Sequence, residues 1–214
     1  MSTYLINKSF KTTVTRSQRV LECAEAFGLG LEEKEFTVYD NLLVDIAQGD
    51  VIYITGQSGS GKSLMLKELV RQIALEQPVA DIDKVELLEV PLIDQVGGST
   101  EEAIRILNLA GLNDAYLFIR KPSELSDGQR YRFRIAKLME SGCKVWAADE
   151  FGAVLDRTTA KVVGFNVRKF AKQCGATLIV ATTHKDLLEE LAPTIYVEKR
   201  FKDKIEMMVT RNVV

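Results

Sequence analysis

The feature that most constrains the fold is a glycine-rich segment, Gly56–Ser63, which lies between an apolar stretch and an amphipathic one. The segment matches the pattern G-x-x-x-x-G-K-S/T at every position. Val51–Thr55, immediately before it, is apolar and has the length of a strand, whereas Ser63–Glu76 carries apolar residues at helical spacing. A strand that runs through such a loop into a helix is typical of α/β proteins.

The glycine-rich segment is predicted to bind the phosphates of a nucleotide. Its glycines let the backbone bend so that successive N–H groups point at phosphate oxygens, and the following helix adds its positive end. We expect Lys62 to reach the β- and γ-phosphates and the Ser63 hydroxyl to bind Mg²⁺. The predicted phosphate-binding residues are Gly56, Gln57, Ser58, Gly59, Ser60, Gly61, Lys62 and Ser63.

An acidic pair, Asp149 and Glu150, follows the continuous apolar run Val145–Ala148. Such a run is typical of a parallel strand that is covered on both faces. Ligands bind beyond the carboxyl ends of parallel strands, so the pair and the glycine-rich segment are expected at one rim of the sheet. Asp149 is predicted to hold Mg²⁺ through water, and Glu150 to act as the general base on the attacking water.

The remaining pattern alternates strands with helices, which predicts a largely parallel α/β sheet. Further strands are expected at Phe36–Ile46, Val85–Val90, Thr177–Ala181, Thr194–Val197 and Ile205–Val209. Further helices are expected at Ser17–Phe27, Thr100–Leu109, Ser126–Glu140, Thr158–Cys174 and Lys185–Leu191.

Composition and cysteine content limit the partners and the cellular compartment that can be expected of the protein. A net charge of -2 over 214 residues provides no general attraction to nucleic acid or to anionic membranes. The chain has no apolar run of the roughly 20 residues that span a bilayer, and its first residues lack the layout of a signal peptide. The cysteines Cys23, Cys143 and Cys174 are far apart and odd in number, which favours free thiols in a reducing compartment. We therefore expect a cytoplasmic protein.

Leu125–Gln129 reads Leu-Ser-Asp-Gly-Gln and continues into a predicted helix that carries Arg130 and Arg132. This segment, shortly before the acidic strand, resembles the signature of the ATP-binding-cassette (ABC) ATPases, whose usual form is L-S-G-G-Q. The resemblance covers roughly residues 36–209. It implies an ATP hydrolase with the fold of a P-loop NTPase: a RecA-like, mostly parallel sheet, an antiparallel β part and a short helical insert.

The resemblance also implies roles for single residues. Ser126, Asp127, Gly128 and Gln129 would contact the γ-phosphate bound to the other subunit of a dimer, although Asp127 replaces the usual glycine. Gln95 matches the Q-loop glutamine, which contacts Mg²⁺ or the attacking water. Asp156 matches the D-loop, which crosses to the partner, and His184 matches the switch histidine that senses the γ-phosphate. Tyr39, or else Phe36, is the aromatic candidate for stacking on adenine.

The resemblance implies that residues 1–214 form a single ABC ATPase domain. Residues 1–35 are an N-terminal extension with a helix, and residues from about 96 to 140 form a reduced helical subdomain that carries the signature. Only about 30 residues separate Gln95 from Ser126, an interval that is usually longer in transporter ATPases.

The shortness of this interval favours one of three functional interpretations. In the preferred one, the chain is a soluble ABC ATPase that homodimerises on Mg-ATP and works on a protein partner. In the alternative, it is the ATP-binding subunit of a membrane transporter and lies at the membrane periphery. In the second alternative, suggested by Asp127, it is a nucleotide-gated binding module with little turnover. Contact of two basic clusters with nucleic acid is less expected, because charged helix faces are common on surfaces. The clusters are Arg130, Arg132, Arg134 and Lys137, and Lys199, Arg200, Lys202 and Lys204.

Overall fold

The computed structural model describes residues 1–200 and 205–211. The chain divides into two compact units: an N-terminal unit, Thr3–Val44, and a core unit that comprises Met1–Ser2 and Asp45–Val214. The boundary lies at Val44, beyond the predicted end of the N-terminal extension at residue 35. Within the described residues, no helix combines the length and the hydropathy needed to cross a bilayer.

The N-terminal unit is built on two paired strands, β1 (Ser2–Thr12) and β2 (Lys34–Ile46), with helix α1 (Gln18–Phe27) between them in sequence. The α1 helix begins where the Ser17 hydroxyl accepts a hydrogen bond from the Val20 N–H. It ends at Gly28, whose left-handed backbone (φ 60°) closes the last turn. The helix expected at Ser17–Phe27 and the strand expected at Phe36–Ile46 are both present.

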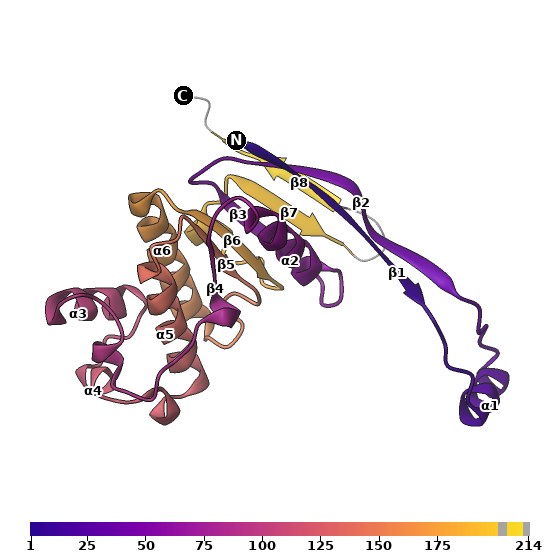
Figure 1. Cartoon of the computed structure of the whole chain (residues 1–214), viewed down its shortest axis with the longest axis horizontal. Coiled ribbons are helices and arrows are strands. Elements are labelled where there is room, and N and C mark those ends of the chain that lie inside the picture. The colour runs from indigo at the N-terminus through magenta and orange to yellow at the C-terminus, as the bar shows by residue number, and fades with distance from the viewer. Residues whose placement is uncertain (201–204, 212–214) are drawn as a thin grey trace. The chain divides into compact units, whose positions relative to one another are not determined.

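The core unit is organised by a six-stranded sheet in the order β4-β5-β6-β3-β7-β8 (Figure 1). Its strands are β3 (Val51–Gly56), β4 (Val79–Asp81), β5 (Val145–Ala148), β6 (Thr177–Thr182), β7 (Ile195–Lys199) and β8 (Ile205–Val209). The neighbours from β4 to β7 pair in parallel, and β8 pairs antiparallel with β7. The predicted fold class, a mostly parallel sheet with an antiparallel part, is confirmed.

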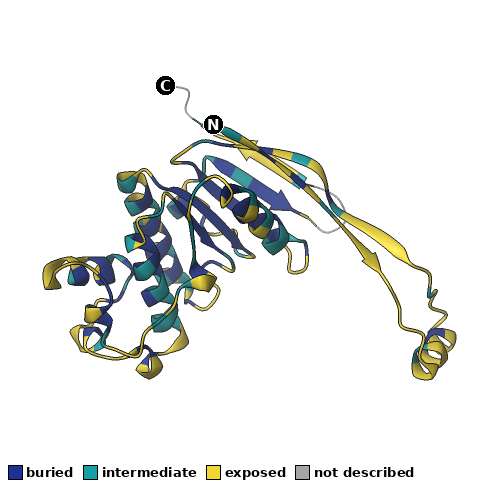
Figure 2. Cartoon of the chain, in the orientation of Figure 1, coloured by how far each residue is buried: buried dark blue, intermediate teal, exposed yellow. Residues whose placement is uncertain are grey.

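Helices cover the central strands of this sheet. Every residue of β3 and β6 is buried, as their apolar sequences predict for strands with both faces covered (Figure 2). The helices of the core unit are α2 (Lys62–Ile73), α3 (Thr100–Leu109), α4 (Ala115–Phe118), α5 (Asp127–Glu140), α6 (Arg157–Cys174) and α7 (Leu188–Leu191). Short 3-10 turns lie at Ile82–Lys84, Leu92–Asp94 and Pro122–Glu124.

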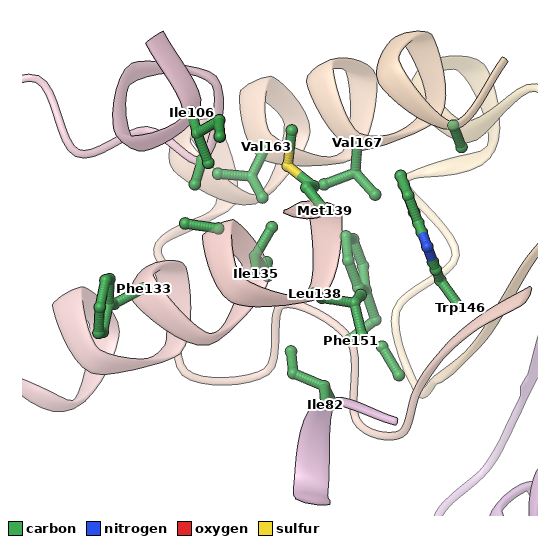
Figure 3. Close-up of a cluster of buried hydrophobic side chains, with 14 of the residues drawn as sticks. Ile82, Ile106, Phe133, Ile135, Leu138, Met139, Trp146, Phe151, Val163 and Val167 are labelled. Carbon is green, nitrogen blue, oxygen red and sulfur yellow. The ribbon is translucent and has the colours of Figure 1, made fainter. Parts of the chain in front are cut away.

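A continuous apolar cluster joins the helical region to the sheet (Figure 3). Met139 of α5 lies beside Val163 and Val167 of α6 in this cluster, and Leu138 of α5 lies on the side of Phe151, which follows β5. Trp146 of β5 is 1% exposed, and its indole N–H donates to the Cys143 carbonyl at 2.8 Å. The position of α5 relative to the end of β5 is therefore set by close packing.

The prediction of a strand at Val85–Val90 is wrong. Beyond β5, the edge of the sheet is formed by the three residues of β4, and residues 85–90 form a loop. The Gln95 side chain bonds the backbone of this loop at Leu88 and Val90, which satisfies polar groups that a sheet partner would otherwise have to satisfy.

Candidate functional site

The candidate site is a pocket of about 360 Å³ at the rim where β3, β5 and β6 end. The three strands are adjacent and parallel, so their carboxyl ends meet at this edge of the sheet. The pocket is lined by Ser58, Gly59, Lys62, Ser63, Asp149, Glu150, Ala153, Ala181, Thr182 and Thr183. The glycine-rich loop and the acidic pair thus share one site, as the sequence predicts.

The glycine-rich loop has a backbone that other residues would not adopt. Gly56, Gly59 and Gly61 have φ values of 144°, 74° and 101°. A Cβ atom at Gly56 would also clash with the carbonyl of Lys199 on β7. Glycine is therefore required here both for the turn and for the close approach of a neighbouring strand.

The loop offers unsatisfied polar groups to a ligand. The Ser60 hydroxyl is buried and has no hydrogen-bond partner among the described residues. Gly61 precedes α2 and, as a glycine, has no side chain that could cap the first N–H groups of this helix. The positive end of a helix and a buried hydroxyl suit phosphate oxygens.

Lys62 supplies the positive charge of the pocket. Its side chain is 8% exposed, and its Nζ donates to the Gln57 carbonyl at 2.7 Å. Burial lowers the pKa of Lys62, and the carboxylates of Asp149 and Glu150 oppose that shift. A cation held close to the loop backbone is well placed to bind a polyphosphate.

Two oxygen atoms in the pocket suit a hard divalent cation. Ser63 Oγ, at the start of α2, donates to Asp149 Oδ1 at the end of β5, and the two atoms are 3.0 Å apart. Hydroxyl and carboxylate oxygens are the ligand types that Mg²⁺ prefers. These residues therefore fit the ion that the sequence predicts here.

Glu150 has an exposed side chain on a strained backbone. Its φ of 47° lies in the left-handed region, which residues other than glycine rarely adopt. Its N–H donates to Asp149 Oδ1 at 3.0 Å. The turn presents the Glu150 carboxylate to the pocket beside Asp149, in the position expected of a base.

Gln95 does not lie in this pocket. Its side chain is 8% exposed and is engaged with its own loop: Nε2 donates to the carbonyls of Leu88 at 2.8 Å and Val90 at 2.7 Å, and Oε1 accepts from the Leu88 N–H. The structure therefore does not support the predicted contact of Gln95 with Mg²⁺ or the attacking water, because both Nε2 hydrogens and one lone pair of Oε1 are engaged with the loop at Leu88 and Val90.

His184 lies next to the pocket but does not line it. It follows Thr183, which does, and its side chain is partly exposed. Its carbonyl accepts hydrogen bonds from the hydroxyls of Tyr53 and Thr55, both on β3. The sequence pattern did not reveal this anchoring role of Tyr53, because it depends on the pairing of β3 with β6.

The signature residues form the start of α5, outside the pocket. Ser126 Oγ accepts from the Gln129 N–H at 3.3 Å, and Gln129 Oε1 accepts from the Ser126 N–H at 2.9 Å. This is a reciprocal cap of the helix. The Asp127 side chain is 86% exposed and pairs with Arg130 at 2.9 Å, so its charge is turned towards its own helix. Gly128, the remaining signature residue, lies in the first turn of α5.

Asp156 caps the next helix, and Tyr39 is buried. Asp156 Oδ1 accepts from the Thr159 N–H at 2.9 Å, and this bond lowers the pKa of Asp156. The Tyr39 ring is 1% exposed, which leaves no open face for a base, whereas Phe36 is 59% exposed. The structure therefore does not support Tyr39 as the residue that stacks on adenine.

Three further residues line the pocket that were not predicted to do so: Ala153, Thr182 and Thr183. Thr182 and Thr183 follow the predicted strand at Thr177–Ala181, and this position at a strand end could have predicted their place in the pocket. Ala153 reaches the pocket only because the turn after Glu150 folds back, with the Ala153 N–H donating to the Glu150 carbonyl at 2.9 Å.

No family model matches the chain, but curated proteins and solved structures do. The methionine import ATP-binding protein MetN 1 of Oceanobacillus iheyensis is 27% identical over 191 residues, which cover 71% of this chain and 55% of that protein. The alpha-hemolysin translocation ATP-binding protein HlyB of Escherichia coli is 30% identical over 198 residues, covering 76% of this chain and 28% of HlyB. The chain therefore spans about half of the first relative and less of the second.

Among solved structures, the ATP-binding cassette MJ0796, in a dimeric post-hydrolysis state with ADP and Pi, aligns with a TM-score of 0.67. It is 16% identical, and the alignment covers 99% of this chain and 100% of that one. A putative metal-chelate type ABC transporter in an inward-facing conformation aligns with a TM-score of 0.60 at 20% identity, covering 82% and 79% of the two chains. The fold predicted from the signature is confirmed, and the relatives favour the transporter alternative over the soluble interpretation.

Proposed function

This chain belongs to the ATP-binding-cassette ATPases, and from that premise we propose that it binds Mg-ATP in the rim pocket and hydrolyses it. One observation carries the proposal: Lys62, Ser63, Asp149 and Glu150, from distant parts of the sequence, line a single pocket of about 360 Å³. Each provides a group that phosphoryl transfer to water requires.

The roles follow from the position of each group. The N–H groups of the loop and of the α2 start, together with Lys62, bind and orient the phosphates. Ser63 and Asp149 would hold Mg²⁺, which would neutralise phosphate charge when bound. Glu150 accepts a proton from the attacking water. The signature lies outside this pocket, which supports a second part of the proposal: two copies associate, and each signature completes the site of its partner.

We further propose that the partner is the membrane subunit of a transporter. The relatives that carry "import" and "translocation" in their names support this choice. The core unit also has exposed apolar side chains near Gln95, at Leu88 (58%), Val90 (40%), Tyr116 (75%) and Ile119 (64%). We call these four residues the docking surface.

The two segments that carry the docking surface are joined by a backbone hydrogen bond, in which the Leu92 N–H donates to the Arg120 carbonyl at 3.0 Å. A shallow cavity of about 470 Å³, lined by Leu88, Lys84 and Lys137 among others, adjoins the first segment. Apolar residues grouped in this way are typical of a surface that another protein covers.

The experiment that tests the partner uses membranes from cells that encode the chain. The purified protein is added to stripped membranes, and co-sedimentation and ATP hydrolysis are measured together. The variants Leu88→Glu and Tyr116→Glu should lose co-sedimentation at least about tenfold, since each would bury a charge in an apolar interface. Leu75→Glu, an equally exposed apolar residue (80%) outside the docking surface, is the matched control and should bind normally. Two outcomes would favour the soluble interpretation. In one, Leu88→Glu, Tyr116→Glu and Leu75→Glu co-sediment with the membranes equally; in the other, the wild type does not co-sediment at all.

A further inference from the structure

The turn that carries Glu150 needs support from its surroundings. A glutamate at φ 47° is unfavourable, and such a conformation persists only where surrounding contacts stabilise it. Three backbone donors of the turn are bonded within the sheet edge or within the turn itself. They are Glu150 N–H to Asp149 Oδ1 at 3.0 Å, Phe151 N–H to the Ala181 carbonyl at 2.9 Å, and Ala153 N–H to the Glu150 carbonyl at 2.9 Å.

The remaining donor of this turn is bonded to a different element. The Gly152 N–H donates to the phenol oxygen of Tyr131 at 3.0 Å. Tyr131 lies in the second turn of α5, shortly after the signature residues. This hydrogen bond therefore joins the signature helix to the turn that holds Glu150 within one chain.

Packing fixes the geometry of this bond. The Tyr131 ring lies edge-to-face against Phe151, with the ring centroids 6.4 Å apart and an interplanar angle of 69°. Phe151 is 1% exposed and belongs to the apolar cluster around α5 and α6 (Figure 3). Gly152 itself lies close to α6, since a Cβ atom added there would be 3.2 Å from Cβ of Ala160. The contact with Phe151 thus holds the phenol ring beside the turn.

The phenol also keeps its proton at physiological pH. Burial raises the pKa of Tyr131 far above its ordinary value. The oxygen therefore remains a neutral acceptor for the Gly152 N–H, and the bond does not depend on pH in the physiological range.

We propose that Tyr131 is a positioning residue that holds the Glu150 turn in its catalytic geometry and ties it to the signature helix. The inference rests on the proposed function, in which Glu150 serves the ATP of its own chain and the signature serves the ATP of the partner. The Tyr131–Gly152 hydrogen bond would then couple the position of α5 to that of the turn that carries the base. Tyr131 acts through this turn and does not line the pocket itself.

The test uses the variant Tyr131→Phe in the full chain, which removes the hydroxyl and keeps the ring against Phe151. Amide hydrogen exchange of the peptide that contains Gly152, measured without nucleotide, should accelerate about tenfold, because one protecting hydrogen bond is lost. The kcat for ATP should fall about five- to tenfold with KM unchanged, because the base is misplaced while the phosphate-binding groups are intact.

Tyr196→Phe is the matched control. It also removes a phenol hydrogen bond, to Glu198 Oε2 at 3.2 Å, from a tyrosine in the core unit that makes an edge-to-face ring contact. The control should change neither exchange at Gly152 nor kcat. Equal kcat for wild type and Tyr131→Phe, or unchanged exchange at Gly152, overturns the proposal. A wild type without turnover would contradict the proposed function instead, and the exchange rate would still decide whether Tyr131 restrains the turn.

Discussion

At the scale of single residues, the site combines one buried cation with two carboxylates that have different surroundings. Asp149 Oδ1 accepts hydrogen bonds from both the Ser63 hydroxyl and the Glu150 N–H, so this oxygen connects the start of α2 to the turn after β5. Glu150 keeps an exposed carboxylate on a strained backbone. An exposed carboxylate on a turn at the rim of the pocket is suited to accept a proton.

Glu150→Gln should therefore abolish the base while keeping the shape of the side chain. We expect ATP hydrolysis to fall at least about 100-fold, with ATP affinity within a factor of a few of wild type. Phosphate release and nucleotide binding by calorimetry measure the two effects. Glu189→Gln, an exposed carboxylate on α7, is the control and should retain full activity. Negligible release by both wild type and Glu150→Gln, with normal binding, would instead support the nucleotide-gated binding module.

At the scale of elements, the antiparallel end of the sheet is attached by an ion pair whose carboxylate is buried and whose guanidinium is partly exposed. Arg211, after β8, donates to Asp50, before β3, at 2.6 Å. Asp50 is 4% exposed and also accepts from the Ala47 N–H at 2.7 Å and the Thr194 hydroxyl at 2.9 Å. Burial alone would raise the pKa of Asp50, but these bonds, that of Arg211 foremost, outweigh burial and lower it.

Arg211→Met should cost about 3 kcal/mol at neutral pH, because it leaves a buried carboxylate without its counter-charge. The folded pKa of Asp50 lies below the unfolded value of about 3.9, so the stabilisation is present above that pH and is lost as the pH falls through the folded pKa. The difference between wild type and variant should therefore shrink in acid, as measured by urea unfolding at several pH values. Arg71→Met breaks an exposed pair with Glu68 and should cost under about 1 kcal/mol. Equal costs for the two variants would contradict this account.

At the scale of the whole molecule, the proposed function requires each chain to contribute to two ATP sites, its own and that of its partner. The rim pocket holds the groups for phosphate and metal, whereas Ser126 and its neighbours cap α5 outside that pocket. A complete site of the kind proposed requires a second copy, and ATP then provides much of the interface.

We expect Glu150→Gln to double its molecular mass in light scattering when saturating Mg-ATP is added, because bound ATP is no longer cleaved. In the Glu150→Gln background, the second substitution Ser126→Arg should keep the protein monomeric. The long arginine side chain would occupy the space that the partner's γ-phosphate needs. The substitution also removes a helix cap, worth about 1 kcal/mol. Ser99→Arg removes the cap of α3 and controls for that loss, so it should leave dimer formation intact. A monomer mass for Glu150→Gln under saturating Mg-ATP would contradict the dimer.

Local patterns were enough to predict most elements of the core unit. The apolar runs at Val51–Thr55 and Val145–Ala148 are strands, and the helix at Thr100–Leu109 has the predicted bounds. The strand predicted at Val85–Val90 failed, because the edge of the sheet was already formed by Val79–Asp81. Its side-chain pattern suited a strand, but pairing depends on which segments are neighbours in space.

The position of the glycine-rich loop and the acidic pair at one rim could be predicted from the sequence alone, because it depends on glycine backbones, a lysine and carboxylates at the ends of predictable strands. The folded chain was needed to show that Gln95 bonds its own loop, that Tyr39 is buried and that Tyr131 reaches Gly152. Each of these depends on contacts between segments that are distant in sequence or on the folding of an irregular loop. Hydrogen bonds of this kind form wherever a buried polar group finds a partner, and no local periodicity records which partner that is.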